Sequence, residues 1–436
     1  MINPVDQPGR AKAKQSKSPM ILAGFNKDAR LLNESFGLPK LTYCTNIHTG
    51  ASWDDVLESL HQCVPSVRSQ LDVESLGIGL RLSAEAVQSL QLAANREDLS
   101  DFTEKGYPVF TVNAFPYGAF HGEPVKSRVY APDWSTPERL EYTQDVARLL
   151  ATLNQPGSFA SISTVPGTFK QWDTPELRTA ITQNLLLAVA ELARIERDTG
   201  VHIALALEPE PCCMLETIAE AIAWFNEAVL SPTAREKLAS LCKVDLQVSE
   251  TLIRRHLGIC YDVCHAAVEF ENPAGSLQML EAAGISIPKI QLSSALRVAC
   301  VDESTLKHLS AFDEPVYLHQ VVQSSGDTLT RFVDLPEALE QRVNALGSEW
   351  RIHFHVPVFI EQLAHFDTTQ FFLKEVLAYY RQNPCSPHLE VETYTWDVLP
   401  ADLRTTDISS AIARELDWVR NELLSEIPAN EPGAAG

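Results

Sequence analysis

The sequence predicts an α/β protein built on one (β/α)8 barrel, with an insertion near the seventh βα loop. Three observations support this fold class. Short apolar runs, typical of strands buried on both faces, alternate with longer amphipathic segments over about residues 40 to 425. The runs number eight, and most successive runs are about 30 to 55 residues apart. An open doubly wound sheet is the alternative, but no GxGxxG follows the first run.

The eight expected strands are LTYCTNIH, LGIGLRL, PVFTVNAF, FASISTV, HIALALEPEP, LGICYDVCH, PKIQLSSAL and HLEVETYTW. The last two runs are about 100 residues apart, which a barrel of this class accommodates as an insertion. This interval contains PVYLHQVV, TRFVDLPEAL and WRIHFHVPVF, and we place the insertion at about residues 300 to 360. We expect HFHVPVF to lie in it and not to form a ninth barrel strand.

Helix-start signals lie between the runs. At three of them, a residue that can cap a helix precedes a residue favoured in the first helical turn. These pairs are Ser52 with Asp55, Thr136 with Pro137, and Thr174 with Pro175. The helix after Thr174 is expected to end at Gly200, because glycine adopts the left-handed conformation of a helix C-terminus at little cost.

The two ends differ in composition from the barrel segment. Residues 1–39 are polar, basic and rich in Pro, Lys and Ser, so we expect a flexible leader, and we expect residues 426–436 to be a disordered tail. No apolar stretch follows the basic start, which argues against a secretory signal. No window approaches the roughly 18 apolar residues of a membrane span.

Charge and cysteine content restrict the partners and the compartment. The formal net charge of −22 disfavours broad contact with nucleic acid, which Lys and Arg bind by neutralising phosphates. Nine cysteines, an odd number without a CxxC pair, indicate reduced thiols in a cytoplasmic protein.

Polar side chains end most of the expected strands, where the active site of such a barrel lies. Asn46 and His48 end the first run, Asn113 the third, Glu208 and Glu210 the fifth, Asp262 and His265 the sixth, Gln291 and Ser293 the seventh, and Glu390 and Glu392 the eighth. Acidic groups that converge on one mouth repel one another, and a divalent cation, together with a raised carboxyl pKa, relieves that repulsion. The sequence therefore predicts a shared polar pocket.

The alternative is a set of unrelated structural polar residues. His48 and His121 would then be ordinary hydrogen-bonding histidines, and His353 and His355 would face water from an edge strand. Glu390 would pair with a Lys or Arg at the bottom of the barrel.

The acidic strand ends resemble the xylose-isomerase-like barrels, which include ketose 3-epimerases and the endonuclease IV fold. The epimerases hold a metal with a Glu on the fifth strand, an Asp on the sixth, a His on the seventh and a Glu on the eighth. The resemblance implies that LALEPEP supplies Glu208, CYDVCHAAV supplies Asp262, and VETYTW supplies Glu392, with Glu390 as the alternative. It also implies that His265, three residues after the Asp, contacts the substrate.

The seventh strand departs from this pattern. Gln291 stands where the family has its metal-binding His, and Ser294 stands where it has an Asp, although QLSSALR still offers Arg297 as a phosphate or hydroxyl contact. A Gln oxygen is a hard neutral ligand, so the exchange favours Mg²⁺ or Mn²⁺ over Zn²⁺, or means that the metal is lost.

Within this group, residues 40 to 400 resemble the metabolite-traffic protein EboE family, on TYCTNIH, NAFPYGAFHG and HFHVPVF. That resemblance implies a role in moving or maturing a small metabolite precursor, beside a membrane prenyltransferase-like partner. It implies no particular reaction.

In the parent chemistry, two glutamates exchange a proton on the carbon next to a carbonyl. Here Glu208 and Glu392 would be that pair, and the metal ligands would be Glu208, Asp262, Gln291 and Glu392. The expected substrate contacts are Asn46, His48, His121, Glu210, His265, Arg297, His353, His355 and Glu390. If HFHVPVF folds over the barrel mouth, His353 or His355 replaces the imidazole missing at Gln291.

Three functions follow from these observations. The first is a metal-dependent isomerase, epimerase or lyase acting on a polyol or sugar-like molecule. The second is a binding or carrier protein that has kept the pocket and lost the chemistry, which Gln291 favours. The third is a DNA-repair nuclease of endonuclease IV type, against which the acidic charge argues.

Overall fold

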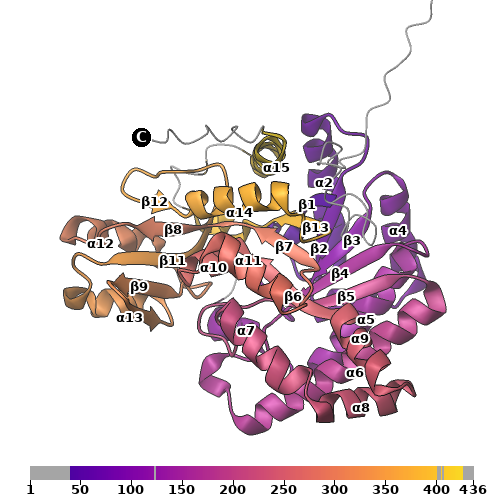
Figure 1. Ribbon diagram of the computed structural model, residues 1–436. Helices are drawn as coiled ribbons and strands as arrows, with labels where there is room; N and C mark the ends of the chain where they lie inside the picture. Colours follow the sequence, from indigo (N-terminus) through magenta and orange to yellow (C-terminus); the bar gives the residue numbers. More distant parts are fainter. Residues whose placement is uncertain (1–39, 122–123, 400–403, 405–406, 426–436) are drawn as a thin grey trace, which may run out of the picture.

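A closed barrel of eight parallel strands forms the centre of the fold in the computed structural model (Figure 1). The barrel strands are β1 (Lys40–Cys44), β2 (Gly77–Arg81), β3 (Val109–Asn113), β4 (Phe159–Thr164), β5 (His202–Leu207), β6 (Leu257–Asp262), β7 (Lys289–Leu292) and β13 (His388–Val391). Consecutive strands are neighbours, and β1 pairs with β13 to close the barrel. The predicted (β/α)8 fold is confirmed, and each of the eight predicted runs supplies one barrel strand.

The structure describes residues 40–121, 124–399, 404 and 407–425. The expected flexible leader and disordered tail lie outside these residues. None of the described helices is long and apolar enough to cross a membrane. All nine cysteines lie in the described part of the chain, and each of them is free of disulfide bonds.

Helices cover the outside of the barrel, and three of them, α2, α5 and α6, begin at the predicted starts. They are α2 (Trp53–Leu71), α3 (Ala84–Ser89), α4 (Ala93–Glu104), α5 (Pro137–Leu153), α6 (Pro175–Thr199), α7 (Ile218–Trp224), α8 (Pro232–Cys242), α9 (Leu246–His256), α10 (Val263–Val268), α11 (Pro273–Ala282), α14 (Gln370–Gln382) and α15 (Ile408–Leu424). Ser52 and Asp55 form the complete capping box of α2. The Thr174 hydroxyl caps α6, which ends at Gly200 with φ of 75°. The Thr136 side chain, by contrast, makes no capping bond to α5 and donates to the Asp133 carbonyl.

A second sheet of five strands follows the seventh barrel strand. Its strands are β8 (Ser294–Val298), β9 (Val321–Ser325), β10 (Thr328–Phe332), β11 (Glu349–Val356) and β12 (Asp367–Thr368), and its order is β10-β9-β11-β8-β12. Two short helices, α12 (Glu303–Leu309) and α13 (Leu335–Glu340), accompany it at the left of Figure 1. The sheet begins six residues before the expected boundary at 300 and ends eight residues after 360. HFHVPVF contributes to β11 and so belongs to this sheet and not to the barrel.

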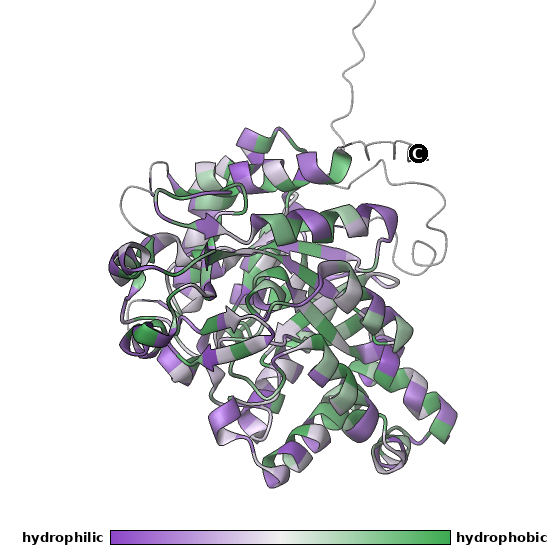
Figure 2. Cartoon of the chain, turned by 60° about the vertical axis from the view of Figure 1, so that its left-hand side comes forward, coloured by the Kyte–Doolittle hydropathy of each residue, from purple (hydrophilic) through white to green (hydrophobic). Residues whose placement is uncertain are grey.

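The hydrophobic core surrounds the barrel strands, most of which are buried along their whole length. Figure 2 shows hydrophobic residues concentrated at the centre of the molecule, while the outer helices carry both hydrophobic and hydrophilic residues. Strand β11 is also mostly buried and pairs antiparallel with β8, with an irregularity between Ile352 and His355. This irregular segment contains the histidines that the sequence analysis singled out.

Candidate active site

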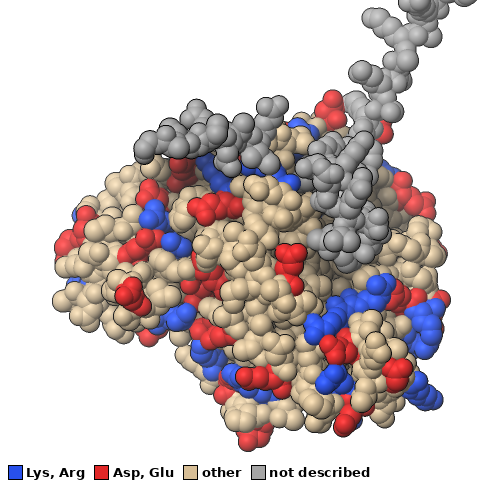
Figure 3. Space-filling view, in the orientation of Figure 1, with Lys and Arg blue, Asp and Glu red and all other residues tan. Residues whose placement is uncertain are grey.

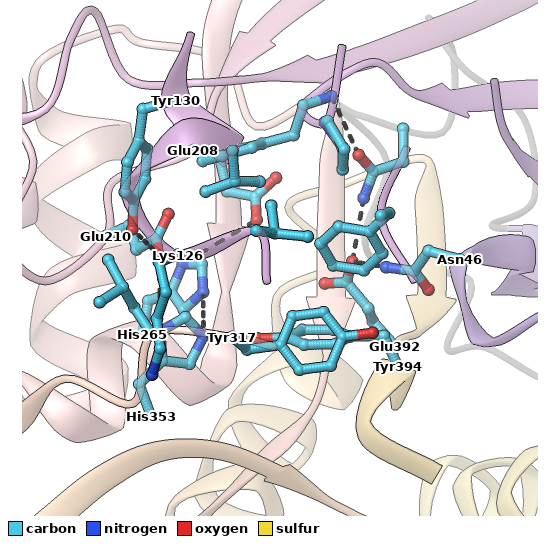
Figure 4. Close-up of a pocket in the computed structure, with 17 residues that line it drawn as sticks. Asn46, Lys126, Tyr130, Glu208, Glu210, His265, Tyr317, His353, Glu392 and Tyr394 are labelled. Carbon is cyan, nitrogen blue, oxygen red and sulfur yellow. Dashed lines mark hydrogen bonds and ion pairs between the residues drawn. The ribbon is translucent and has the colours of Figure 1, made fainter. Parts of the chain in front are cut away.

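A cavity opens at the carboxyl ends of the barrel strands (Figure 4). The space between its lining residues, including its open mouth, is about 520 Å³. The polar and charged lining residues are Asn46, Asn113, Lys126, Tyr130, Glu208, Glu210, His265, Tyr317, His353, Glu392 and Tyr394. Apolar side chains, among them Phe115, Phe120 and Leu318, complete the wall. The expected shared polar pocket therefore exists at the expected end of the barrel.

Three buried carboxylates meet beside this cavity. Glu208 follows β5, Asp262 ends β6 and Glu392 follows β13, and each offers an oxygen within 4.8 Å of the other two. Among the described residues, Glu208 Oε2 and Asp262 Oδ2 have no hydrogen-bond partner, although both atoms are buried. A carboxylate oxygen that is buried without a partner has lost its hydrogen bonds to water, and no protein group replaces them. The cluster is therefore incomplete without a cation or a proton.

Asp262 uses its two oxygens differently. Oδ1 accepts hydrogen bonds from the His265 amide at 3.0 Å and from Ser293 Oγ at 2.8 Å, and so caps the short helix α10. The three-residue spacing between Asp262 and His265 is thus the spacing of a helix cap. Oδ2 is buried and has no hydrogen-bond partner among the described groups.

Glu392 is held in place by side-chain amides. Its Oε1 accepts from Asn46 Nδ2 at 2.7 Å and from Asn113 Nδ2 at 2.9 Å, and its Oε2 accepts from Gln291 Nε2. The amide of Asn113 cannot be reversed without loss, because its oxygen accepts the Phe115 N–H at 3.1 Å. Glu392 is therefore fixed, whereas Glu208 keeps one unpartnered oxygen.

Gln291 positions Glu392 in this geometry and presents no free oxygen to the cluster. Its Oε1 accepts from the Cys260 thiol at 2.6 Å while its NH2 group faces Glu392. For Gln291 to ligate a metal, as the resemblance implied, its amide would have to turn and give up both contacts.

Burial and mutual repulsion shift the pKa values of these acids. Burial first, and then the neighbouring carboxylates, raise the pKa values of Glu208 and Glu392 well above their usual range. Burial alone would also raise the pKa of Asp262. His265, His355, the Ser293 hydroxyl and the His265 amide together hold that pKa below its usual value. Of the three carboxyl groups, that of Asp262 is therefore the one that most readily carries the negative charge when no cation is bound.

Strand β11 brings two further imidazoles to the mouth, as the sequence analysis anticipated. His353 Nε2 lies 3.1 Å from His265 Nε2 and 3.2 Å from His355 Nε2. His265, His355 and Asp262 also offer ligand atoms within 4.8 Å of one another. The histidine cluster formed by His265, His353 and His355 therefore adjoins the carboxylate cluster.

Glu210 lies beside this histidine cluster. Its Oε1 accepts from the Tyr130 hydroxyl at 2.7 Å and from Gln320 Nε2 at 3.1 Å. Burial raises its pKa. Gln320, which comes from the segment before β9, was not identified from the sequence, because no local pattern links it to residue 210.

Five predicted contact residues do not line the cavity, namely His48, His121, Arg297, His355 and Glu390. His48 bonds to the Tyr43 hydroxyl at 3.1 Å, and His121 bonds to the Asn46 carbonyl and to the Tyr317 hydroxyl, both at 2.6 Å. Arg297 points to Glu349 on β11, with Nε 2.8 Å from Oε1, because the chain continues from β7 into the second sheet instead of a loop. Glu390 is paired with Lys289 inside the barrel, at 2.6 Å between Nζ and Oε1. Glu392, and not Glu390, thus reaches the cavity.

The aromatic wall was also missed by sequence reasoning. Tyr130, Tyr317 and Tyr394 come from segments about 80 to 260 residues apart, and only the fold brings them together. The one signal in the sequence was NAFPYGAF, which supplies Phe115 and Phe120 directly after β3.

Comparisons with known proteins find similarity in structure only. No family model matches the sequence, and no curated protein matches it. Among solved structures, the probable 3-DHS dehydratase AsbF of Bacillus anthracis, involved in petrobactin synthesis, is 13% identical, with a TM-score of 0.44 over 88% of this chain and 99% of that chain. A D-allulose 3-epimerase from Methylomonas sp. is 12% identical, with a TM-score of 0.44 over 88% of this chain and 96% of its own. A xylose isomerase-like TIM barrel protein from Mycobacterium smegmatis, in complex with magnesium, is 11% identical, with a TM-score of 0.46 over 88% and 96%.

Identities and TM-scores this low carry no argument about function. One fold serves many reactions, so we argue function from the site alone.

Proposed function

We propose that this protein is a metal-dependent isomerase, epimerase or lyase that acts on a small polyol or sugar-like metabolite. The observation that carries the proposal is the convergence of Glu208, Asp262 and Glu392, each with an oxygen within 4.8 Å of the other two, beside a cavity. The polar wall, with its amide, hydroxyl and imidazole groups, matches a ligand rich in hydroxyl groups.

The donor set fits a divalent cation. Glu208 Oε2 and Asp262 Oδ2 are buried and unpartnered, and the pKa values of Glu208 and Glu392 are raised first by burial and then by the neighbouring carboxylates. Glu208, Asp262 and Glu392 would hold the ion, which when bound would polarise a carbonyl and hold the neighbouring hydroxyl. Oxygen-only donors favour Mg²⁺ or Mn²⁺ in this position.

The two glutamates would have different tasks. Glu208 would take the proton from the carbon next to the carbonyl, through the carboxylate oxygen that does not hold the ion. Glu392, held by Asn46, Asn113 and Gln291, would act from a fixed position on the other side of the substrate. Asn46 Oδ1 is buried and has no partner among the described groups, so it is available to accept from a substrate hydroxyl.

A non-catalytic metabolite carrier is the second candidate. It is favoured by Glu392, whose three amide contacts restrict its movement, as suits a binding group better than a base. The resemblance to the EboE family supports either role in a pathway that matures or moves a metabolite precursor. A membrane prenyltransferase-like partner belongs to that same proposal.

Metal analysis of the purified protein beside Glu208→Gln tests the proposal. We expect stoichiometric Mg²⁺ or Mn²⁺ in the wild type and little in the variant at equal folded fraction. Incubation of a panel of ketoses and polyols in D2O would then show deuterium at the exchanged carbon with the wild type only. Stoichiometric metal without exchange would favour the carrier, and metal that is unaffected by Glu208→Gln would contradict the proposed site.

A further inference from the structure

We infer that the ligand of this cavity is a polyol or sugar-like head joined to an apolar group, because one wall of the cavity offers hydrogen-bonding groups and the other offers hydrocarbon. For the polar head the inference rests on the proposed function, and it adds a second half to the ligand. The two walls come from different parts of the chain.

The polar wall consists of side chains at the carboxyl ends of barrel strands. Asn46, Asn113, Glu208 and Glu392 line the cavity there, at or shortly after the ends of β1, β3, β5 and β13. Asn46 Oδ1 is buried and has no hydrogen-bond partner among the described groups, so it can accept from a ligand hydroxyl. This wall therefore suits the polyol end of a ligand.

The apolar wall consists of side chains from two segments, one between β3 and α5 and one before β9. The amides of Val125 and Lys126 both donate to the Val316 carbonyl, at 2.8 and 3.0 Å, and so join the two segments. The apolar side chains that line the cavity from these segments are Phe115, Pro116, Phe120, Val125, Val129 and Leu318. None of these six side chains can donate or accept a hydrogen bond.

The two tyrosines that these segments add present their rings to the cavity, because their hydroxyls already have protein partners. The Tyr130 hydroxyl donates to Glu210 Oε1 and accepts from Gln320 Nε2, both at 2.7 Å. His121 Nε2 donates to a backbone carbonyl, so its Nδ1 accepts from the Tyr317 hydroxyl at 2.6 Å.

Lys126, the cation that lines the cavity from these segments, is already paired. Its Nζ lies 2.6 Å from Asp334 Oδ2 and donates to the Glu314 carbonyl at 3.2 Å. A ligand hydroxyl buried against the apolar wall would therefore lose its bonds to water without replacement, which weakens binding by about 5- to 150-fold. An alkyl or aryl group would instead gain affinity from leaving water.

The apolar wall begins directly beside the carboxylate cluster. Tyr394 follows Glu392 by two residues, and its ring centroid lies 5.1 Å from that of Phe120 and 5.2 Å from that of Tyr317. The rings of Phe120 and Tyr317 are likewise 5.1 Å apart. A head bound at Glu392 thus has aromatic rings next to it, against which a substituent can pack.

Calorimetric titration of the full chain in Mg²⁺ with methyl, butyl and hexyl glycosides tests this inference. Glucosides, galactosides and mannosides are used, so that the result does not depend on one head, and phenyl glycosides compare an aryl group with hexyl. We expect butyl to bind at least about tenfold more tightly than methyl in at least one series, since each buried CH2 group contributes about fourfold. Equal affinities, or no binding in any series, would overturn the inference.

Matched variants establish where the gain arises. Val129→Asn places an amide on the apolar wall and should reduce the gain from methyl to butyl below about threefold, while the methyl glycoside binds as before. Val343→Asn is the control, because Val343 is 79% exposed, and it should keep the full gain. An unchanged gain in Val129→Asn would place the alkyl group elsewhere and overturn the inference. Leu318→Asn serves the same purpose if Val129→Asn fails to fold.

The outcomes for this inference and for the proposed function are distinct. Deuterium exchange on free ketoses, together with affinities that do not change with chain length, would overturn the inference and leave the proposed function intact. A chain-length gain that Val129→Asn abolishes, without bound metal or exchange, would support the inference and contradict the proposed chemistry.

Discussion

Lys289 Nζ lies 2.6 Å from Glu390 Oε1 in the interior of the barrel, and both side chains are fully buried. Lys289 also donates to Ser163 Oγ at 3.1 Å. The space around Glu390 is closed, since a Cβ placed on Gly79 of β2 would lie 1.6 Å from Glu390 Oε2. This ion pair holds Glu390 inside the barrel, and Glu390 does not line the cavity.

Lys289→Met should destabilise the protein by about 3–5 kcal/mol, because it leaves a buried carboxylate without its partner. The double variant Lys289→Met/Glu390→Gln should recover much of this loss, since it removes both charges. Urea unfolding at pH 7 measures both, and strictly additive losses in the double variant would contradict the pairing. The exposed pair Arg148–Asp145 is the control, where Arg148→Ala should cost about 0–1 kcal/mol.

Asn113→Leu should weaken divalent-metal binding by about 10–100-fold, because Glu392 loses a donor that orients it. A competition assay with a metal-sensitive dye would measure the affinity, and a melting curve would establish that the variant is folded. A lower melting temperature with unchanged metal affinity would mean that the amide contacts serve stability alone.

Glu415 should make stability fall as the pH rises from about 4.5 to about 7. Burial raises its folded pKa from 4.5 to about 7, although Thr393 Oγ1 and the Val358 N–H donate to it. The folded state therefore retains a proton that the unfolded state releases. The stabilisation, about 3 kcal/mol from 1.36 kcal/mol per pKa unit, is complete below pH 4.5 and lost above pH 7.

Glu415→Gln isolates this effect, because it keeps the accepting oxygen and cannot ionise. The unfolding free energy of the wild type should fall more between pH 4.5 and pH 8 than that of the variant. The exposed residue Glu236 provides a control, since Glu236→Gln should give a curve parallel to the wild type. Parallel curves for Glu415→Gln would refute the prediction.

The chain lacking residues 1–39 should not bind DNA at physiological salt. The formal charge of the whole chain is −22, and Figure 3 shows Lys and Arg interspersed with Asp and Glu on the face in view. An electrophoretic mobility shift with a 30-base-pair duplex is the measurement. Sub-micromolar binding after the deletion would show that the charge argument is wrong.

The sequence by itself determined the barrel and the acidic strand ends. Buried parallel strands require nearly continuous apolar runs, and capping residues such as Ser52 and Thr174 act over three or four residues, so both signals are local. That Glu208, Asp262 and one of Glu390 and Glu392 meet follows from the same logic, because every strand of a parallel barrel ends at the same mouth.

Only the tertiary structure decided which polar groups meet. Glu390 and Glu392 share a face, but two residues along a strand is roughly 6–7 Å, which places Glu390 a layer deeper beside Lys289. Arg297 was misplaced because β7 runs on into β8. His353 reaches His265 across 88 residues through a strand of the second sheet. Contacts of this kind depend on strand order and register between distant segments, which the local periodicity of a sequence does not encode.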